Sequence, residues 1–167
     1  MYHLVCLANL EEGDLGIRLL VLGAFAIVLG LVTGTNAIAG DKELVKYIIK
    51  NDAISKSLTG KPGNAENGRK LVINRKKGNC LACHTMPIAE QPFHGNVGPD
   101  LHGVGSRLTE GEIRLLIVNS KVLNEGTIMP AFYVNTGYNR VLKKFKGKSM
   151  LTAAEVEDLV AYTVSLK

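Results

Sequence analysis

The sequence predicts an all-α domain, and three observations support this prediction. Apolar residues recur at the i, i+3, i+4 spacing of helices in several segments, and no segment of any length shows the alternation typical of a strand. Long segments rich in glycine and proline separate the expected helices, and long loops in a small domain usually wrap around something. The 167 residues, 46% hydrophobic and 21% charged, suffice for one compact domain and exclude a disordered chain.

The first residues are expected to form an export signal. Residues 19–32 are an unbroken apolar run, shorter than the about 20 residues that a membrane-spanning helix needs. Arg18 precedes the run, and Ala37-Ile38-Ala39 is a small-x-small cleavage site. We therefore predict a cleaved signal peptide over residues 1–39 and a periplasmic mature protein without a membrane span. An uncleaved anchor is the alternative, and the acidic residues before Arg18 are unusual for an export signal.

Cleavage would change both the charge and the cysteine count. The formal net charge would rise from +5 to +7, because residues 1–39 carry one arginine and three acidic residues. Cys6 would be lost, which leaves Cys80 and Cys83 and excludes a disulfide-rich scaffold. The positive charge suits acidic proteins or small anions, and with no nucleic-acid-binding motif we expect no nucleic-acid partner.

An N-terminal extension is expected over residues 40–62, before a main domain at residues 63–167. Leu44, Tyr47 and Ile48 recur at helical spacing with lysines on the other face, which predicts an amphipathic helix within the extension. This helix would pack on the main domain, or would serve as a docking segment for a partner.

Three helices are expected in the main domain. Asn64 caps the first, which runs to Arg75. Thr109 begins the second, and Thr152 with Glu155 forms a capping box at the start of the third. The positions expected to form their apolar faces are Leu71 and Val72, then Ile113, Leu116 and Ile117, then Val156, Leu159, Val160 and Val164. Residues 91–105 and 124–138 are predicted to be loops.

Residues 80–84 read Cys-Leu-Ala-Cys-His, and C-x-x-C-H is the attachment signature of c-type haem. One helical turn places the thiols of Cys80 and Cys83 on one side, where they can form thioethers with the haem vinyl groups, and His84 follows as an axial iron ligand. A redox dithiol and half of a zinc site are the alternatives, but the sequence offers neither a βαβ context nor a second cysteine pair. We therefore expect one covalently bound haem c, which would also fill a core in which only 5% of residues are aromatic.

The second axial ligand is expected to be Met129. It lies 45 residues after His84, which is enough chain to pass around the porphyrin edge, and Pro130 restricts the backbone beside it. The other candidates are Met86, His94, His102 and Met150. Met86 lies too close to His84, and Met150 lies beside the last helix. His94 and His102 therefore remain the alternatives. A His/Met pair leaves no open iron position and favours Fe(II), which indicates electron transfer.

The second ring nitrogen of His84 needs a hydrogen-bond acceptor that orients the imidazole. The segment Gly98-Pro99 is a candidate source, because it precedes a predicted helix and proline has no N–H of its own. We therefore expect a backbone carbonyl at Pro99 to hold the imidazole.

The order of these parts resembles that of class I c-type cytochromes. It runs from a helix with Gly68 through C-x-x-C-H and residues 98–103 to Met129-Pro130 and a final helix. The resemblance implies a class I cytochrome c fold, with helices and long loops wrapped around one covalent haem and with Gly68 packed against Tyr162. It also implies that Arg107 contacts a haem propionate, for which an ordinary surface arginine is the alternative.

Several longer blocks are similar to the SoxX-type sulfur-oxidation cytochromes. They are residues 77–84, 95–99, 103–107, 127–133, 137–141 and 147–162. The resemblance implies a subunit of the SoxAX complex, a periplasmic L-cysteine S-thiosulfotransferase. In that complex a SoxA-like haem subunit is catalytic, the SoxYZ carrier presents the cysteine that receives thiosulfate, and a small cytochrome c accepts electrons. This chain would relay electrons, because its haem occupies both mature cysteines.

Two other functions are open. A free-standing electron shuttle would use exposed lysines for docking. A lysine cluster that fits this use is formed by Lys143, Lys144, Lys146 and Lys148. The alternative is that these lysines form only a solvated face. A haem-based gas sensor would need an open or labile sixth position on the iron.

Overall fold

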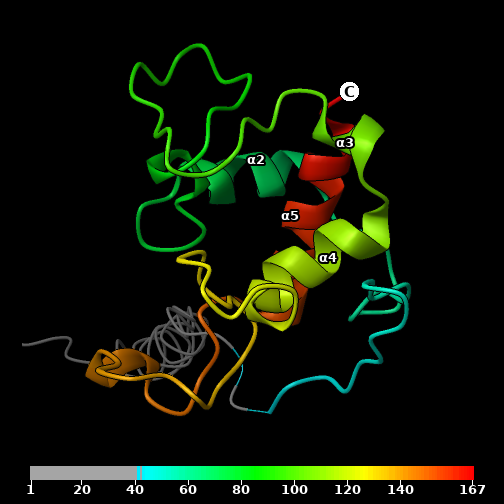
Figure 1. Cartoon of the computed structure of the whole chain (residues 1–167), viewed down its shortest axis with the longest axis vertical. Coiled ribbons are helices and arrows are strands. Elements are labelled where there is room, and N and C mark those ends of the chain that lie inside the picture. Colours follow the sequence, from blue (N-terminus) through cyan, green and yellow to red (C-terminus); the bar gives the residue numbers. More distant parts are fainter. Residues whose placement is uncertain (1–40, 42) are drawn as a thin grey trace, which may run out of the picture. The chain divides into compact units, whose positions relative to one another are not determined.

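The computed structural model describes residue 41 and residues 43–167, and helices are the regular structure of this part (Figure 1). Its α-helices are α2 (Ala65–Ile73), α3 (Val104–Arg107), α4 (Glu110–Asn119) and α5 (Ala153–Ser165). Its 3-10 helices are η1 (Cys80–Ala82), η2 (Ser120–Val122) and η3 (Lys143–Phe145). The described residues form no strand, only one isolated bridge between Lys50 and Ala53. The all-α prediction is therefore confirmed.

The export signal predicted for residues 1–39 lies outside the described residues. In the part that the structure describes, no helix has the length and apolar character needed to cross a membrane.

The predicted helix starts are confirmed. Asn64 accepts a hydrogen bond from the backbone N–H of Asn67 at 2.9 Å, and Thr109 and Thr152 each close a full capping box. α2 ends at Ile73 rather than at Arg75, because the backbone of the next residue turns to an extended conformation. The loop predicted for residues 91–105 ends within α3, a helix of four residues that is too short for a periodic signal.

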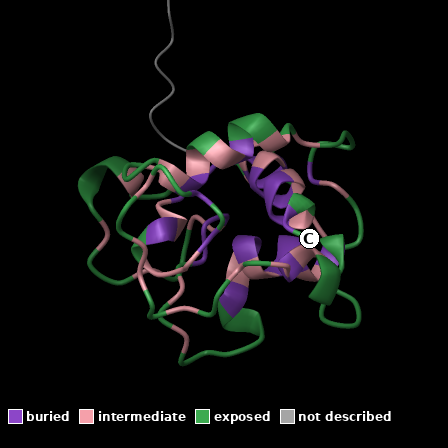
Figure 2. Cartoon of the chain, turned by 90° about the horizontal axis from the view of Figure 1, so that it is seen from above, coloured by how far each residue is buried: buried purple, intermediate pink, exposed green. Residues whose placement is uncertain are grey.

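α5 is the element on which the other α-helices pack. A Cβ on Gly68 of α2 would lie 2.0 Å from the carbonyl oxygen of Asp158 and 2.7 Å from Cβ of Tyr162, so only glycine allows this approach. A Cβ on Gly105 of α3 would lie 2.0 Å from the carbonyl oxygen of Val164. The implied packing of Gly68 on Tyr162 is therefore present. Figure 2 shows buried residues along the helices and also on parts of the loops, whose other parts are exposed or partly buried.

The buried face of α4 differs from the predicted one. Ile113 and Ile117 are buried as expected, but Leu116 is only partly buried, and Leu115 and Arg114 are fully buried instead. A spacing rule that treats arginine as polar cannot place a buried guanidinium on the core side. The rule therefore predicted Leu116 as a core residue and left out Arg114 and Leu115.

The prediction of an amphipathic helix in the N-terminal extension is wrong. Residues 44–49 have no regular secondary structure, although Leu44 and Tyr47 pack against the core. Helix propensity in this segment is weak, because Val45, Ile48 and Ile49 are β-branched. Tertiary contacts therefore decide its conformation.

Asp41 makes several of these contacts. Its carboxylate accepts hydrogen bonds from the backbone N–H of Ala153 at 2.9 Å and from the hydroxyl of Tyr133 at 3.1 Å. Its backbone N–H donates to the hydroxyl of Ser149 at 2.8 Å. The carboxylate thus lies at the N-terminus of α5, where negative charge is favourable.

A buried ion pair attaches the extension to α4 and α5. Arg114 is 0% exposed and Glu157 2% exposed, and Nε and Nη2 of the arginine each lie 2.9 Å from a carboxylate oxygen. Arg114 Nη1 also donates to the carbonyl of Ile54 at 2.7 Å, and Glu157 accepts from the backbone N–H of Leu58 at 2.9 Å. Sequence patterns gave no sign of this pair, because its members lie 43 residues apart.

Candidate functional site

One tight turn carries the C-x-x-C-H motif. Asn79, in the left-handed conformation with φ 50°, precedes η1, and its carbonyl accepts from the backbone N–H of Ala82 at 3.1 Å. The backbone N–H groups of Cys83 and His84 both donate to the carbonyl of Cys80, at 3.1 and 2.9 Å. Both cysteines are free thiols and partly exposed, so the turn presents two thiols and an imidazole within five residues.

The surroundings of Cys80 do not favour the redox-dithiol alternative. Burial of the thiol raises the pKa of Cys80 to about 12, although the residue as a whole keeps part of its surface exposed. A reactive dithiol needs the opposite shift, since the thiolate is its nucleophile. For the zinc alternative, the described residues contain no group of three or more His, Cys, Asp or Glu arranged to hold a metal ion.

The loop of residues 95–101 runs along this turn. The backbone N–H groups of Gly95 and Gly98 donate to the carbonyls of Leu81 and Cys83, each at 2.7 Å. A Cβ on Gly98 would lie 2.4 Å from Cε1 of His84, so a side chain there would collide with the imidazole. Our sequence reasoning missed these close contacts, although the glycines in this loop were the available signal.

Pro99 lies beside His84. Its carbonyl oxygen is 2.7 Å from Nδ1 of the imidazole. Because a carbonyl can only accept, Nδ1 carries the proton and Nε2 keeps its lone pair. Ligating histidines in metal proteins use this second hydrogen bond to fix the tautomer and the ring orientation. The geometry thus leaves His84 with one nitrogen free to bind a metal.

Arg107, at the end of α3, binds the loop that follows Pro99. Its guanidinium donates to the carbonyl of His102 at 2.5 Å and to that of Asp100 at 2.9 Å, and the residue is exposed. These bonds give Arg107 a structural role in the loop. Its contact with a propionate stays a prediction.

Met129 lies on a different segment from the turn. It is partly buried and packs against the core, and its carbonyl accepts from the hydroxyl of Ser120 at 3.1 Å. Its backbone N–H donates to the hydroxyl oxygen of Thr127 at 3.2 Å. None of the hydrogen bonds between described residues joins Met129 to the Cys80–His84 turn, and its role as a ligand stays a prediction.

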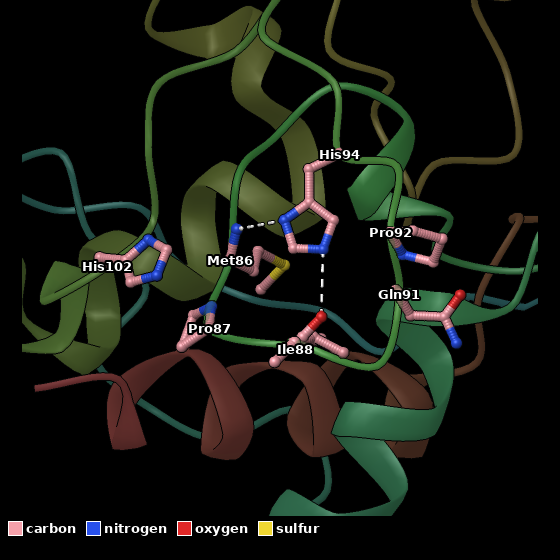
Figure 3. Close-up of a pocket in the computed structure, with 8 residues that line it drawn as sticks. Met86, Pro87, Ile88, Gln91, Pro92, His94 and His102 are labelled. Carbon is pink, nitrogen blue, oxygen red and sulfur yellow. Dashed lines mark hydrogen bonds between the residues drawn. The ribbon is translucent and has the colours of Figure 1, made fainter.

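His94, one of the alternative ligands, has both ring nitrogens engaged. Its Nδ1 accepts from the backbone N–H of Met86 at 3.4 Å and its Nε2 donates to the carbonyl of Ile88 at 3.2 Å; both bonds are drawn in Figure 3. Ligation of iron would break one of these bonds, so this environment does not favour His94.

His102 is the other alternative. It is exposed, and its Nδ1 lies 2.5 Å from the carboxylate of Asp100. Both histidines line a hollow of about 610 Å³ beside residues 86–94 (Figure 3). That hollow is lined by neither His84 nor Met129, so it is separate from the predicted ligand pair.

The helical fold and the C-x-x-C-H turn together define a c-type cytochrome. The family model of cytochrome c matches residues 65–167, and the chain belongs to this family, whose members carry covalently bound haem c. The chain is also similar to a chain in the crystal structure of SoxXA from P. pantotrophus. The two are 39% identical with a TM-score of 0.66, and the match covers 72% of this chain and 94% of that chain. No curated protein gives a significant match.

The residues present fit a haem c. Two free thiols and an imidazole with a free Nε2 occupy one turn, which is the donor set that covalent attachment and axial ligation require.

Proposed function

We propose that this chain is the haem-bearing electron-relay subunit of a SoxXA-type (SoxAX) complex. The observation that carries the proposal is the C-x-x-C-H turn with His84 oriented by the Pro99 carbonyl at 2.7 Å. The similarity to a SoxXA chain, which extends over 94% of that chain, supports the assignment to this branch of the cytochromes.

Each site residue then has a defined role. Cys80 and Cys83 would bind the haem covalently, and His84 Nε2 and the thioether of Met129 would be the axial ligands of its iron. When bound, the haem supplies a one-electron redox couple. Pro99 keeps the proton on His84 Nδ1, and Gly98 leaves room for the imidazole. Arg107 would approach a propionate.

The electron count supports a relay role. Joining thiosulfate to a carrier cysteine forms one sulfur–sulfur bond and releases two electrons, whereas one haem takes up one electron at a time. Both cysteines of the described chain lie in the haem-binding turn, so neither is left as a catalytic thiol. We therefore assign L-cysteine S-thiosulfotransferase catalysis on SoxYZ to a SoxA-like partner in the periplasm, with a small cytochrome c as electron acceptor.

The ligand assignment is tested with the matured holoprotein. Met129→Leu should abolish the far-red methionine-to-iron charge-transfer band and lower the reduction potential, because a neutral thioether favours Fe(II). It should also let the reduced protein bind carbon monoxide. Met150→Leu, a partly buried methionine beside α5, is the matched control and should keep the band. A band that persists in Met129→Leu contradicts the assignment.

The partner assignment is tested by co-expression with a SoxA-like subunit and size-exclusion chromatography. A relay subunit should elute with the larger haem protein, whereas a free-standing shuttle should elute alone.

One observation favours the free-standing shuttle as a second candidate function. Residues 140–148 include five basic residues and no acidic one, and none of the five basic side chains is in an ion pair with a described residue.

A further inference from the structure

The segment that carries Met129 is attached to the end of α4 through its backbone. The backbone N–H of Phe132 donates to the carbonyl of Ile117 at 3.2 Å, and that of Tyr133 donates to the carbonyl of Val118 at 3.1 Å. These carbonyls belong to the last turn of the helix, where intrahelical partners are missing. The segment therefore has a fixed anchor on the C-terminal side of Met129.

Two side-chain hydroxyls bind the backbone on either side of Pro130. Ser120, 4% exposed, donates to the carbonyl of Met129 at 3.1 Å. Tyr138 donates to the carbonyl of Ala131. Burial raises the pKa of Tyr138 to about 12, so its hydroxyl stays protonated and remains a donor at neutral pH. The two hydroxyls come from different segments and meet the chain one residue before and one residue after the proline.

Most of the chain just before Pro130 is exposed, whereas Met129 packs against the core and residues 131–133 are buried. Residues 121–126, Ile128 and Pro130 are exposed, with Ile128 at 74%. Pro130 has a restricted φ, so fixing the carbonyls on both sides of it also fixes the direction in which the Met129 side chain leaves the backbone. The two hydroxyls thus add to the core contacts of Met129 in setting the orientation of its side chain.

We propose that Ser120 and Tyr138 are positioning residues that clamp the Met129 segment and keep its thioether on the haem iron. The inference rests on the proposed function, because it takes Met129 as the axial ligand. Loss of either hydroxyl should raise the fraction of molecules in which the thioether has left the iron. An added ligand that binds only this open form gains apparent affinity in proportion to that fraction.

The experiment is a titration of the oxidised holoprotein with imidazole, followed by the loss of the methionine-to-iron band. Ser120→Ala and Tyr138→Phe should each tighten the apparent affinity by roughly three- to tenfold, the equilibrium effect of one neutral hydrogen bond. Ser120→Thr keeps the hydroxyl and should bind imidazole as the unmodified protein does. Ser149→Ala is the matched control, since Ser149 is 0% exposed and donates to the carbonyl of Leu151. It should lower thermal stability without changing imidazole affinity.

The outcomes separate the clamp from the ligand assignment. A band that depends on Met129, with imidazole affinity unchanged in both Ser120→Ala and Tyr138→Phe, overturns the clamp alone. Equal gains in affinity in these variants and in Ser149→Ala also overturn it, because general loosening would then explain the effect. A band that survives Met129→Leu overturns both the ligand assignment and the clamp. If Ser120→Ala does not mature, Tyr138→Phe decides by itself.

Discussion

Replacement of Glu157 by leucine should cost the holoprotein about 3–5 kcal/mol of unfolding free energy, the usual effect of removing one partner from a buried ion pair. The structure supports a value in this range. Arg114 is 0% exposed and would keep only the Ile54 carbonyl and Glu110 as partners. The backbone N–H of Leu58 would lose its acceptor, a contribution of about 1–3 kcal/mol when such a group stays buried.

The double variant Arg114→Met/Glu157→Leu should be less destabilised than the single variant Glu157→Leu. Removing both charges eliminates the unpaired guanidinium, and apolar side chains of similar size often replace buried ion pairs at little cost. The carbonyl of Ile54 and the N–H of Leu58 would still lack partners, so we expect a residual loss of about 1–3 kcal/mol. The two sites should therefore be strongly non-additive.

The assay is denaturant unfolding of the holoproteins, followed by circular dichroism. Glu66→Gln is the control, because Glu66 and Lys70 form an exposed ion pair at 2.9 Å whose loss should leave the unfolding free energy nearly unchanged. The reasoning is refuted if Glu157→Leu loses less than about 1 kcal/mol, or if the double variant loses the sum of the single losses.

Three further predictions follow from single positions. Gly68→Ala places a methyl group 2.0 Å from a backbone oxygen of α5 and should cost about 1–3 kcal/mol in the same unfolding assay, whereas Gly126→Ala, with no neighbour nearer than 3.4 Å, should be nearly neutral. Gly98→Ala places a methyl group 2.4 Å from the imidazole of His84 and should change the absorption spectrum and the reduction potential of the holoprotein; unchanged values would exclude the close contact. Hydrogen bonds from the hydroxyl and the backbone N–H of Thr109 lower the pKa of Glu112 below 4.5. The stability that these bonds give to the folded protein is therefore fully present above that pH and is lost as the pH falls through the lowered pKa. Glu112→Gln should therefore flatten the acid end of the pH–stability curve, and an unchanged curve would contradict this.

Local signals predicted the helix starts and the motif well, because each depends on residues a few positions apart. Asn64, Thr109 and Thr152 cap their helices as expected, and the spacing of C-x-x-C-H is realised in one turn. The carbonyl of Pro99 also lies beside His84, although 15 residues separate them, and the backbone bonds of Gly95 and Gly98 to the turn bring the loop there.

Long-range contacts were not predictable from these signals. The extension was expected to be helical, but Asp41 binds residues 92 and 112 positions later, and such contacts override a weak local propensity. The apolar face predicted from Ile113, Leu116 and Ile117 left out Arg114, whose burial is accompanied by its ion pair with Glu157, 43 residues away. The roles of Ser120 and Tyr138 depend on where a loop folds back, which no spacing rule describes.

The two segments that would supply the proposed haem ligands both adjoin helices that pack on α5. The turn with His84 follows α2, which meets α5 through Gly68, and α3, just after the Pro99 loop, meets α5 through Gly105. The segment with Met129 follows α4, which packs on α5 and is joined to it by the Arg114–Glu157 pair. A redox centre that keeps both ligands through its cycle needs their separation fixed by rigid elements. Disturbing α2 or α3 should therefore act first on the histidine side, and disturbing α4 should act first on the methionine side.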